Sequence, residues 1–74
     1  MSRYFNKRDL VQTFFQTSER TVDILYGVIE RAGERAAIVR WESGLRNRIA
    51  NTDGDRGVKL AEDQDAARNS MGLS

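Results

Sequence analysis

Large apolar side chains are concentrated in residues 1–50, where they recur at steps of three and four residues. This period places side chains on one face of an α-helix, at about 100° per residue within a stripe roughly 120° wide. The stripe consists of Leu10, Val11, Phe14, Thr21, Val22, Leu25, Val28, Ile29, Ala32, Ala36 and Val39. Phe15 and Ile24 lie at its two edges. The pattern predicts an all-α protein with one long or kinked helix over about residues 7–50.

A second apolar stripe follows the first and points in a different direction. It consists of Ile38, Trp41, Leu45 and Ile49, and its centre lies roughly 150° from the first stripe. Either the helix breaks near Gly33 and residues 34–50 fold back, or one continuous helix contacts different neighbours along its length. An unbroken helix of about 44 residues would be about 66 Å long, whereas a compact domain of this size is about 30 Å across. Because no Pro or Asn-Gly marks a turn between residues 18 and 42, the continuous helix is preferred, and both arrangements require partner chains to cover the stripes.

The predicted helix has a marked beginning. Asn6 is an N-cap residue, and Asp9 is placed to reach back to it. Phe5 and Leu10 have the spacing of a hydrophobic staple across that cap. The sequence therefore predicts a capped helix start at Lys7.

Residues 51–74 form a polar tail within the same domain. They are rich in Asp, Asn, Gly, Ser and Ala, and they follow the loop sequence ANTDGDRG at residues 50–57. A short helix is expected over about residues 58–69, with Asp53 or Asp55 near its start. Its apolar face is poor, so we expect neighbouring chains to hold the tail in place.

Composition excludes several classes of function. The chain has no His and no Cys, which excludes triad-type nucleophilic catalysis and His- or Cys-based metal sites. No catalytic residue, metal or cofactor is predicted, and no small-molecule substrate is expected. No run of 18 apolar residues and no apolar leader segment is present, so a cytoplasmic location, or one within an assembled particle, is expected. The net charge of +1 argues against a strong non-specific phosphate-binding surface.

The sequence TSERTVDIL at residues 17–25 resembles the turn and recognition-helix start of helix-turn-helix proteins. The resemblance covers residues 10–25, and it departs from the pattern at Gln12 and Gln16, where small residues are usual. It implies a helix break near Thr17 and DNA contact through Arg20. The alternative function is therefore a small DNA-binding regulator using residues 10–25.

The sequence NTDGDRGVKLAE at residues 51–62 is similar to an EF-hand calcium loop. Asn51, Asp53, Asp55 and Glu62 occupy loop positions 1, 3, 5 and 12, and Val58 occupies the apolar position 8. Arg56 stands where the sharp turn of such a loop requires glycine. The resemblance implies oxygen ligands for Ca²⁺, but the charge at Arg56 and the single copy favour an ordinary acidic turn.

The function that the stripes favour is non-enzymatic self-assembly. We expect a homo-oligomer, a filament or a subunit of a larger particle such as a virion or a secretion-type apparatus. The partners would be copies of the chain or other subunits of one assembly. The predicted interface consists of Leu10, Val11, Phe14, Val22, Leu25, Val28, Ile29, Ala32, Ala36, Ile38, Val39, Trp41, Leu45 and Ile49.

Overall fold

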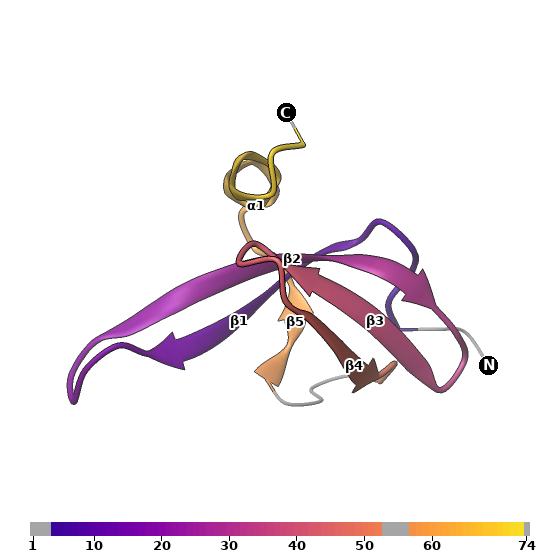
Figure 1. Cartoon of the computed structure of the whole chain (residues 1–74), viewed down its shortest axis with the longest axis horizontal. Helices are drawn as coiled ribbons and strands as arrows, with labels where there is room; N and C mark the ends of the chain where they lie inside the picture. Colours follow the sequence, from indigo (N-terminus) through magenta and orange to yellow (C-terminus); the bar gives the residue numbers. More distant parts are fainter. Residues whose placement is uncertain (1–3, 53–56, 74) are drawn as a thin grey trace.

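The computed structural model describes residues 4–52 and 57–73, which form an antiparallel β-sheet with one short helix (Figure 1). Its elements are β1 (Leu10–Gln16), β2 (Val22–Ala32), β3 (Ala36–Trp41), β4 (Arg46–Ala50), β5 (Lys59–Leu60) and α1 (Gln64–Ser70). The strand order is β4-β3-β2-β1-β5, so β1 to β4 form a meander and β5 returns to the outer edge of β1. The predictions of an all-α protein and of a helix over residues 7–50 are therefore wrong.

The sheet is covered on both faces near its centre, and this arrangement explains the misleading spacing. Leu10 and Val28 face α1 and pack with Ala61 and Ala67. Their sequence neighbours Val11 and Ile29 point to the other face, as alternation along a strand requires, and join the larger core. That core contains Phe5, Val11, Ile29, Ala37, Val39, Trp41, Ile49 and Val58. Consecutive apolar residues on a strand buried on both faces remove the period of two, and the remaining spacing imitates a helix.

The chain reverses direction within the segment predicted to be helical. The β1–β2 turn is closed by the Thr17 N–H, which donates to Thr21 O at 3.0 Å. The β2–β3 turn is closed by the Gly33 N–H, which donates to Ala36 O at 2.8 Å. The polar residues Glu19, Arg20 and Glu34 are turn residues.

The contact predicted between Asn6 and Asp9 forms, but it closes a turn. The Asn6 N–H donates to Asp9 Oδ2 at 2.8 Å, and the Asp9 N–H donates to Asn6 O at 3.1 Å. Phe5 belongs to the larger core, whereas Leu10 packs beneath α1 on the other face of the sheet. The predicted staple between them is absent for this reason.

Asn51 fastens the N-terminal segment to the sheet. Its side chain is buried, and its Oδ1 accepts from the Phe5 N–H at 2.6 Å. Its Nδ2 donates to Phe5 O at 3.1 Å and to Gly33 O at 2.6 Å. One amide therefore joins the end of β4 to the segment before β1 and to the β2–β3 turn.

The tail contains a helix, but a shorter one than residues 58–69. Lys59–Leu60 is a strand, and α1 begins after Asp63, whose side chain accepts from the Ala66 N–H at 3.0 Å. The N-cap is therefore Asp63 and not Asp53 or Asp55, which lie outside the described residues.

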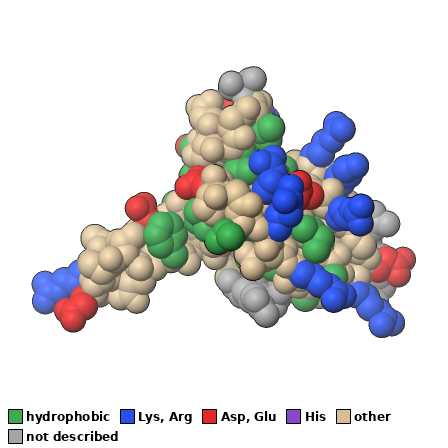
Figure 2. Space-filling model, in the orientation of Figure 1, with side chains coloured by type: hydrophobic (Ala, Val, Ile, Leu, Met, Phe, Trp, Pro, Cys, Tyr) green, Lys and Arg blue, Asp and Glu red, His purple; other side chains and the backbone are tan. Residues whose placement is uncertain are grey.

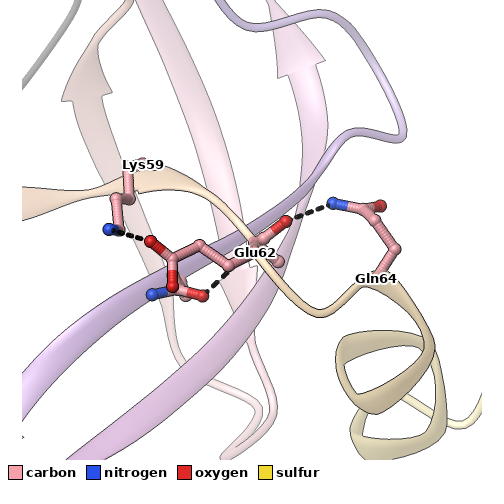
Figure 3. Close-up of polar contacts among 5 residues, drawn as sticks. Lys59, Glu62 and Gln64 are labelled. Atoms are coloured by element: carbon pink, nitrogen blue, oxygen red, sulfur yellow. Dashed lines mark hydrogen bonds and ion pairs between the residues drawn. The ribbon is translucent and has the colours of Figure 1, made fainter.

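Side-chain contacts fix the link between β5 and α1. Lys59 Nζ lies 2.8 Å from Glu62 Oε1, and Gln64 Nε2 donates to Ala61 O at 2.8 Å. Figure 3 shows Lys59, Glu62 and Gln64 in this link. The Glu62 N–H donates to the side chain of Gln12 on β1 at 3.0 Å. The tail is thus held by the chain's own sheet. Among residues 4–52 and 57–73 we find no helix long and apolar enough to cross a membrane.

Candidate functional site

A two-stranded arm extends beyond the rest of the sheet. We define the hairpin arm as residues 13–25, which comprise the last part of β1, the turn and the first part of β2. Strand β5 pairs with β1 only at Val11 and Gln12, and β3 pairs with β2 only from Gly27 onward. The arm therefore has no neighbouring strand on either edge within the described chain, and it projects to the left of the body in Figure 1.

The arm exposes large apolar side chains on both of its faces. Phe14 and Ile24 are cross-strand partners, and Val22 pairs with Gln16 two positions further out on the same face. The exposed fractions are 52% for Phe14, 38% for Ile24 and 61% for Val22. Phe15, which is 43% exposed, lies on the other face opposite Asp23. This concentration of exposed apolar surface on a projecting element is typical of an interaction site.

The arm contacts the rest of the described chain at its base, where Leu25 packs against the larger core. Lys59 Nζ lies 5.7 Å from the centre of the Phe14 ring, which is a cation–π contact at the base of the arm. An isolated two-stranded hairpin is only marginally stable in water. A partner that covers Phe14, Val22 and Ile24 would therefore stabilise the arm as well as bind to it.

The structure divides the predicted interface residues into three groups. Leu10, Val11, Val28, Ile29, Val39, Trp41 and Ile49 are buried by the chain itself, and Leu25, Ala32, Ala36 and Ile38 are partly buried. Phe14, Val22 and Leu45 are exposed. Leu45 lines a hollow of about 280 Å³ together with Leu25, Trp41 and Ile49, while Phe14 and Val22 lie on the arm. Phe15 and Ile24, which lay at the edges of the predicted stripe, join the exposed group.

The helices implied by the helix-turn-helix resemblance are absent, because residues 10–25 form a hairpin. Residues 10–16 and 22–25 lie in antiparallel strands, joined by a turn at residues 17–21. No recognition helix exists that could enter a DNA groove through Arg20.

The calcium-loop resemblance falls partly outside the described residues, since 53–56 are not among them. Within the described part, Asn51 is hydrogen-bonded to Phe5 and Gly33, and Glu62 is paired with Lys59. Nor does any group of three or more acidic side chains there converge as metal ligands.

A second surface, which we call the basic face, lies on the α1 side of strands β2, β3 and β4. Arg40 is the cross-strand partner of Arg46, and Arg48 follows two residues later on the same face. Two adjoining hollows widen the surface. One, of about 470 Å³, is lined by Lys7, Arg8, Val28, Ile29, Glu30, Arg40 and Leu73, and the other by Glu30, Arg31, Ile38 and Arg46. Figure 2 shows Lys and Arg side chains gathered at the end of the molecule away from the arm.

Glu30 is the acidic residue at the centre of the basic face. Its carboxylate lies 2.6 Å from Arg46 Nε and 3.5 Å from Arg40 Nε. Like charges directly opposite each other on paired strands repel, and Glu30 offsets that repulsion. The hydrogen bond from Arg46 holds the pKa of Glu30 below its ordinary value, with burial opposing and nearby Arg charges assisting. The same hydrogen bond raises the pKa of Arg46.

We predict that Glu30→Gln reduces stability near neutral pH and weakens the acid dependence of stability. Because the folded pKa of Glu30 lies below the ordinary 4.5, its contribution is present above that value and is lost as the pH falls through the folded pKa. The urea midpoint of the wild type should therefore exceed that of the variant at pH 6, and the difference should close on acidification below pH 4.5. Glu19→Gln in the arm turn should follow the wild-type profile. A difference that stays constant down to pH 2 to 3 would contradict this assignment.

Comparisons of the chain with protein-family models, with curated proteins and with solved structures gave no significant match. The hairpin arm and the basic face are therefore the two candidate functional surfaces of the described chain.

Proposed function

We propose that this chain is a non-enzymatic assembly protein, and that its hairpin arm docks on the arm of a second copy. The observation that carries the proposal is the exposure of Phe14, Val22 and Ile24 on one face of a ribbon that Lys59 contacts at its base. Such a subunit would act in the cytoplasm or within an assembled particle.

The outer edge of β1 favours a second copy as the partner. Beyond Gln12 this edge has no neighbouring strand, and residues 13–16 (TFFQ) carry no charge and no Pro. An uncharged edge strand without Pro is a template for pairing with another strand. Two such edges meeting antiparallel about a two-fold axis encounter no like-charge repulsion. They would align the Phe14 faces of both arms in one four-stranded ribbon.

The expected assembly depends on concentration. On the Phe14 face two arms contribute about six half-exposed side chains, and burying each further gives roughly 1 kcal/mol, or about 6 kcal/mol gross. Association costs about 4–15 kcal/mol through the loss of translational and rotational entropy. Pairing of the two edge strands adds a further favourable contribution. The arm therefore favours a dimer that dissociates on dilution.

We predict that Phe14→Ser combined with Ile24→Ser converts the assembly to a monomer. Light scattering of the wild type across a concentration series should show a mass that rises above 8.4 kDa, whereas the double variant should remain at that mass. Leu73→Ser is the matched control, because it removes an exposed apolar side chain far from the arm. A wild type that is monomeric at the highest soluble concentration would overturn the proposal, as would dissociation caused equally by the control.

A cysteine crosslink locates the interface within any assembly that forms. The chain has no Cys, so a single introduced thiol can form a disulfide only between copies. Phe15→Cys, near the middle of the proposed pairing edge and so near the two-fold axis, should crosslink on mild oxidation, and Ser70→Cys at the end of α1 should not. An assembly that crosslinks only through residue 70 would assign the interface to α1.

A further inference from the structure

We propose that the basic face binds the phosphate backbone of duplex DNA. Lys7, Arg8, Arg31, Arg40, Arg46 and Arg48 share this face with Glu30. Glu34 and Glu42 lie in the turns at the ends of β3 and not among these cations. Folding therefore gathers cations on one face, although positive and negative charges nearly cancel over the whole chain, whose net charge is +1.

Most of the cations on this face have no ion-pair partner within the part of the chain that the structure describes. Glu30 is shared between Arg40 and Arg46, so one carboxylate serves two guanidinium groups. Lys7, Arg8, Arg31 and Arg48 make no ion pair within residues 4–52 and 57–73. A cluster of unpaired cations is the electrostatic pattern expected of a surface that releases counterions from a polyanion.

The chemistry of the face favours phosphate groups as its ligands. Arg predominates there, and the guanidinium group donates two parallel hydrogen bonds to a phosphate. The cations come from three strands and from the segment before β1, so they are spread over the face and are not gathered at one point. A spread of this kind fits several phosphates of one polymer better than a single small anion.

Duplex DNA fits the face better than a single strand does. Proteins that bind single strands without sequence preference stack bases on aromatic side chains. The residues lining the two hollows include no aromatic ring, and the exposed Phe14 and Phe15 lie on the arm. Contacts confined to phosphates would make the binding independent of base sequence.

The basic face and the hairpin arm are at opposite ends of the sheet. The cations lie on β3, β4, the second half of β2 and the segment before β1, whereas the arm includes the first half of β2. Pairing of two arms would thus leave both basic faces open. The DNA proposal does not rest on the dimer, because the double variant at Phe14 and Ile24 keeps every cation of the face.

The test is fluorescence anisotropy of a labelled duplex of about 20 bp, titrated with the full chain from about 50 to 200 mM salt. With about four unpaired cations engaged, log K should fall against log salt with a slope near −3.6. Arg48→Gln should reduce the magnitude of that slope by about 0.9 and weaken binding to all duplex sequences alike. Arg20→Gln in the turn of the arm removes the same charge at the other end of the sheet and should leave the slope unchanged.

The outcomes separate this proposal from its rivals. No binding at about 50 mM salt, or an equal effect of Arg48→Gln and Arg20→Gln, would overturn it. Tighter binding of a single strand than of the duplex would overturn the choice of ligand. Binding of polyglutamate but not of DNA would indicate that the ligand of the basic face is an acidic protein. DNA binding retained by a monomeric Phe14→Ser, Ile24→Ser variant would support the basic face and show that it acts without the arm.

Discussion

Replacing Asn51 with Ala is expected to lower the free energy of unfolding by about 3 kcal/mol or more. The buried Asn51 side chain satisfies the N–H and the carbonyl of Phe5 and the carbonyl of Gly33. Truncation leaves these backbone groups without partners, and each unsatisfied buried group costs about 1–3 kcal/mol. Urea denaturation followed by Trp41 fluorescence measures the change, since Trp41 is part of the same core.

Two further variants identify the cause of this loss. Asn69→Ala removes an exposed amide on α1 and should change stability by less than about 0.5 kcal/mol. Asn51→Asp keeps an acceptor for the Phe5 N–H but removes the donor to Gly33 O and buries a charge, so it should also destabilise the fold. If Asn51→Ala changes stability no more than Asn69→Ala does, Asn51 does not anchor the N-terminal segment.

The Asn51 variant also has an expected functional effect. Phe5 is adjacent to the segment that places Lys7 and Arg8 over the basic face, where the Arg8 N–H donates to Ile29 O at 2.7 Å. Release of Phe5 should loosen that segment. Weaker DNA binding by folded Asn51→Ala would then arise without loss of a charge.

The sequence predicts local contacts of this protein better than its fold class. The Asn6–Asp9 contact forms as a local motif, although it closes a turn. Strand pairing, by contrast, is set by contacts distant in sequence, such as Leu10 with Val28 and Val11 with Leu60. A helical spacing of apolar residues distinguishes a helix from a strand only where strands show their period of two. In this protein, burial of the strands on both faces removed that period.

Part of the proposed interaction surface could be predicted from the sequence, and part could not. Phe14 and Val22 were predicted as interface residues, and both are exposed on the arm. The TVDI run at residues 21–24 alternates polar and apolar residues, which is a strand signal that could have revealed Ile24. The basic face gives no local signal, because its cations come from four separate segments and the whole-chain charge is nearly neutral.

Replacing Gly27 with Ala is expected to destabilise the fold by about 2–3 kcal/mol, and replacing it with Val by more. A Cβ at Gly27 would lie 2.7 Å from Trp41 Cε3, 2.9 Å from Val39 Cγ2 and 3.0 Å from Arg40 O. These distances are shorter than carbon–carbon and carbon–oxygen contacts allow. Strand β3 would therefore have to move away from β2, since one of the opposing atoms belongs to the backbone.

The position of Gly27 links this effect to the arm. Gly27 pairs with Val11 on one side and with Trp41 on the other, so it lies where the arm joins the body. Gly33→Ala is the matched control, because a Cβ there would meet only Ala36 O, at 3.3 Å. Thermal unfolding should therefore show a much lower midpoint for Gly27→Ala than for Gly33→Ala. Equal midpoints would mean that β2 and β3 do not approach each other closely at Gly27. If the order is as expected, a bulky residue at Gly27 should also weaken assembly, because the arm can present Phe14 and Ile24 to a partner only from a rigidly paired base.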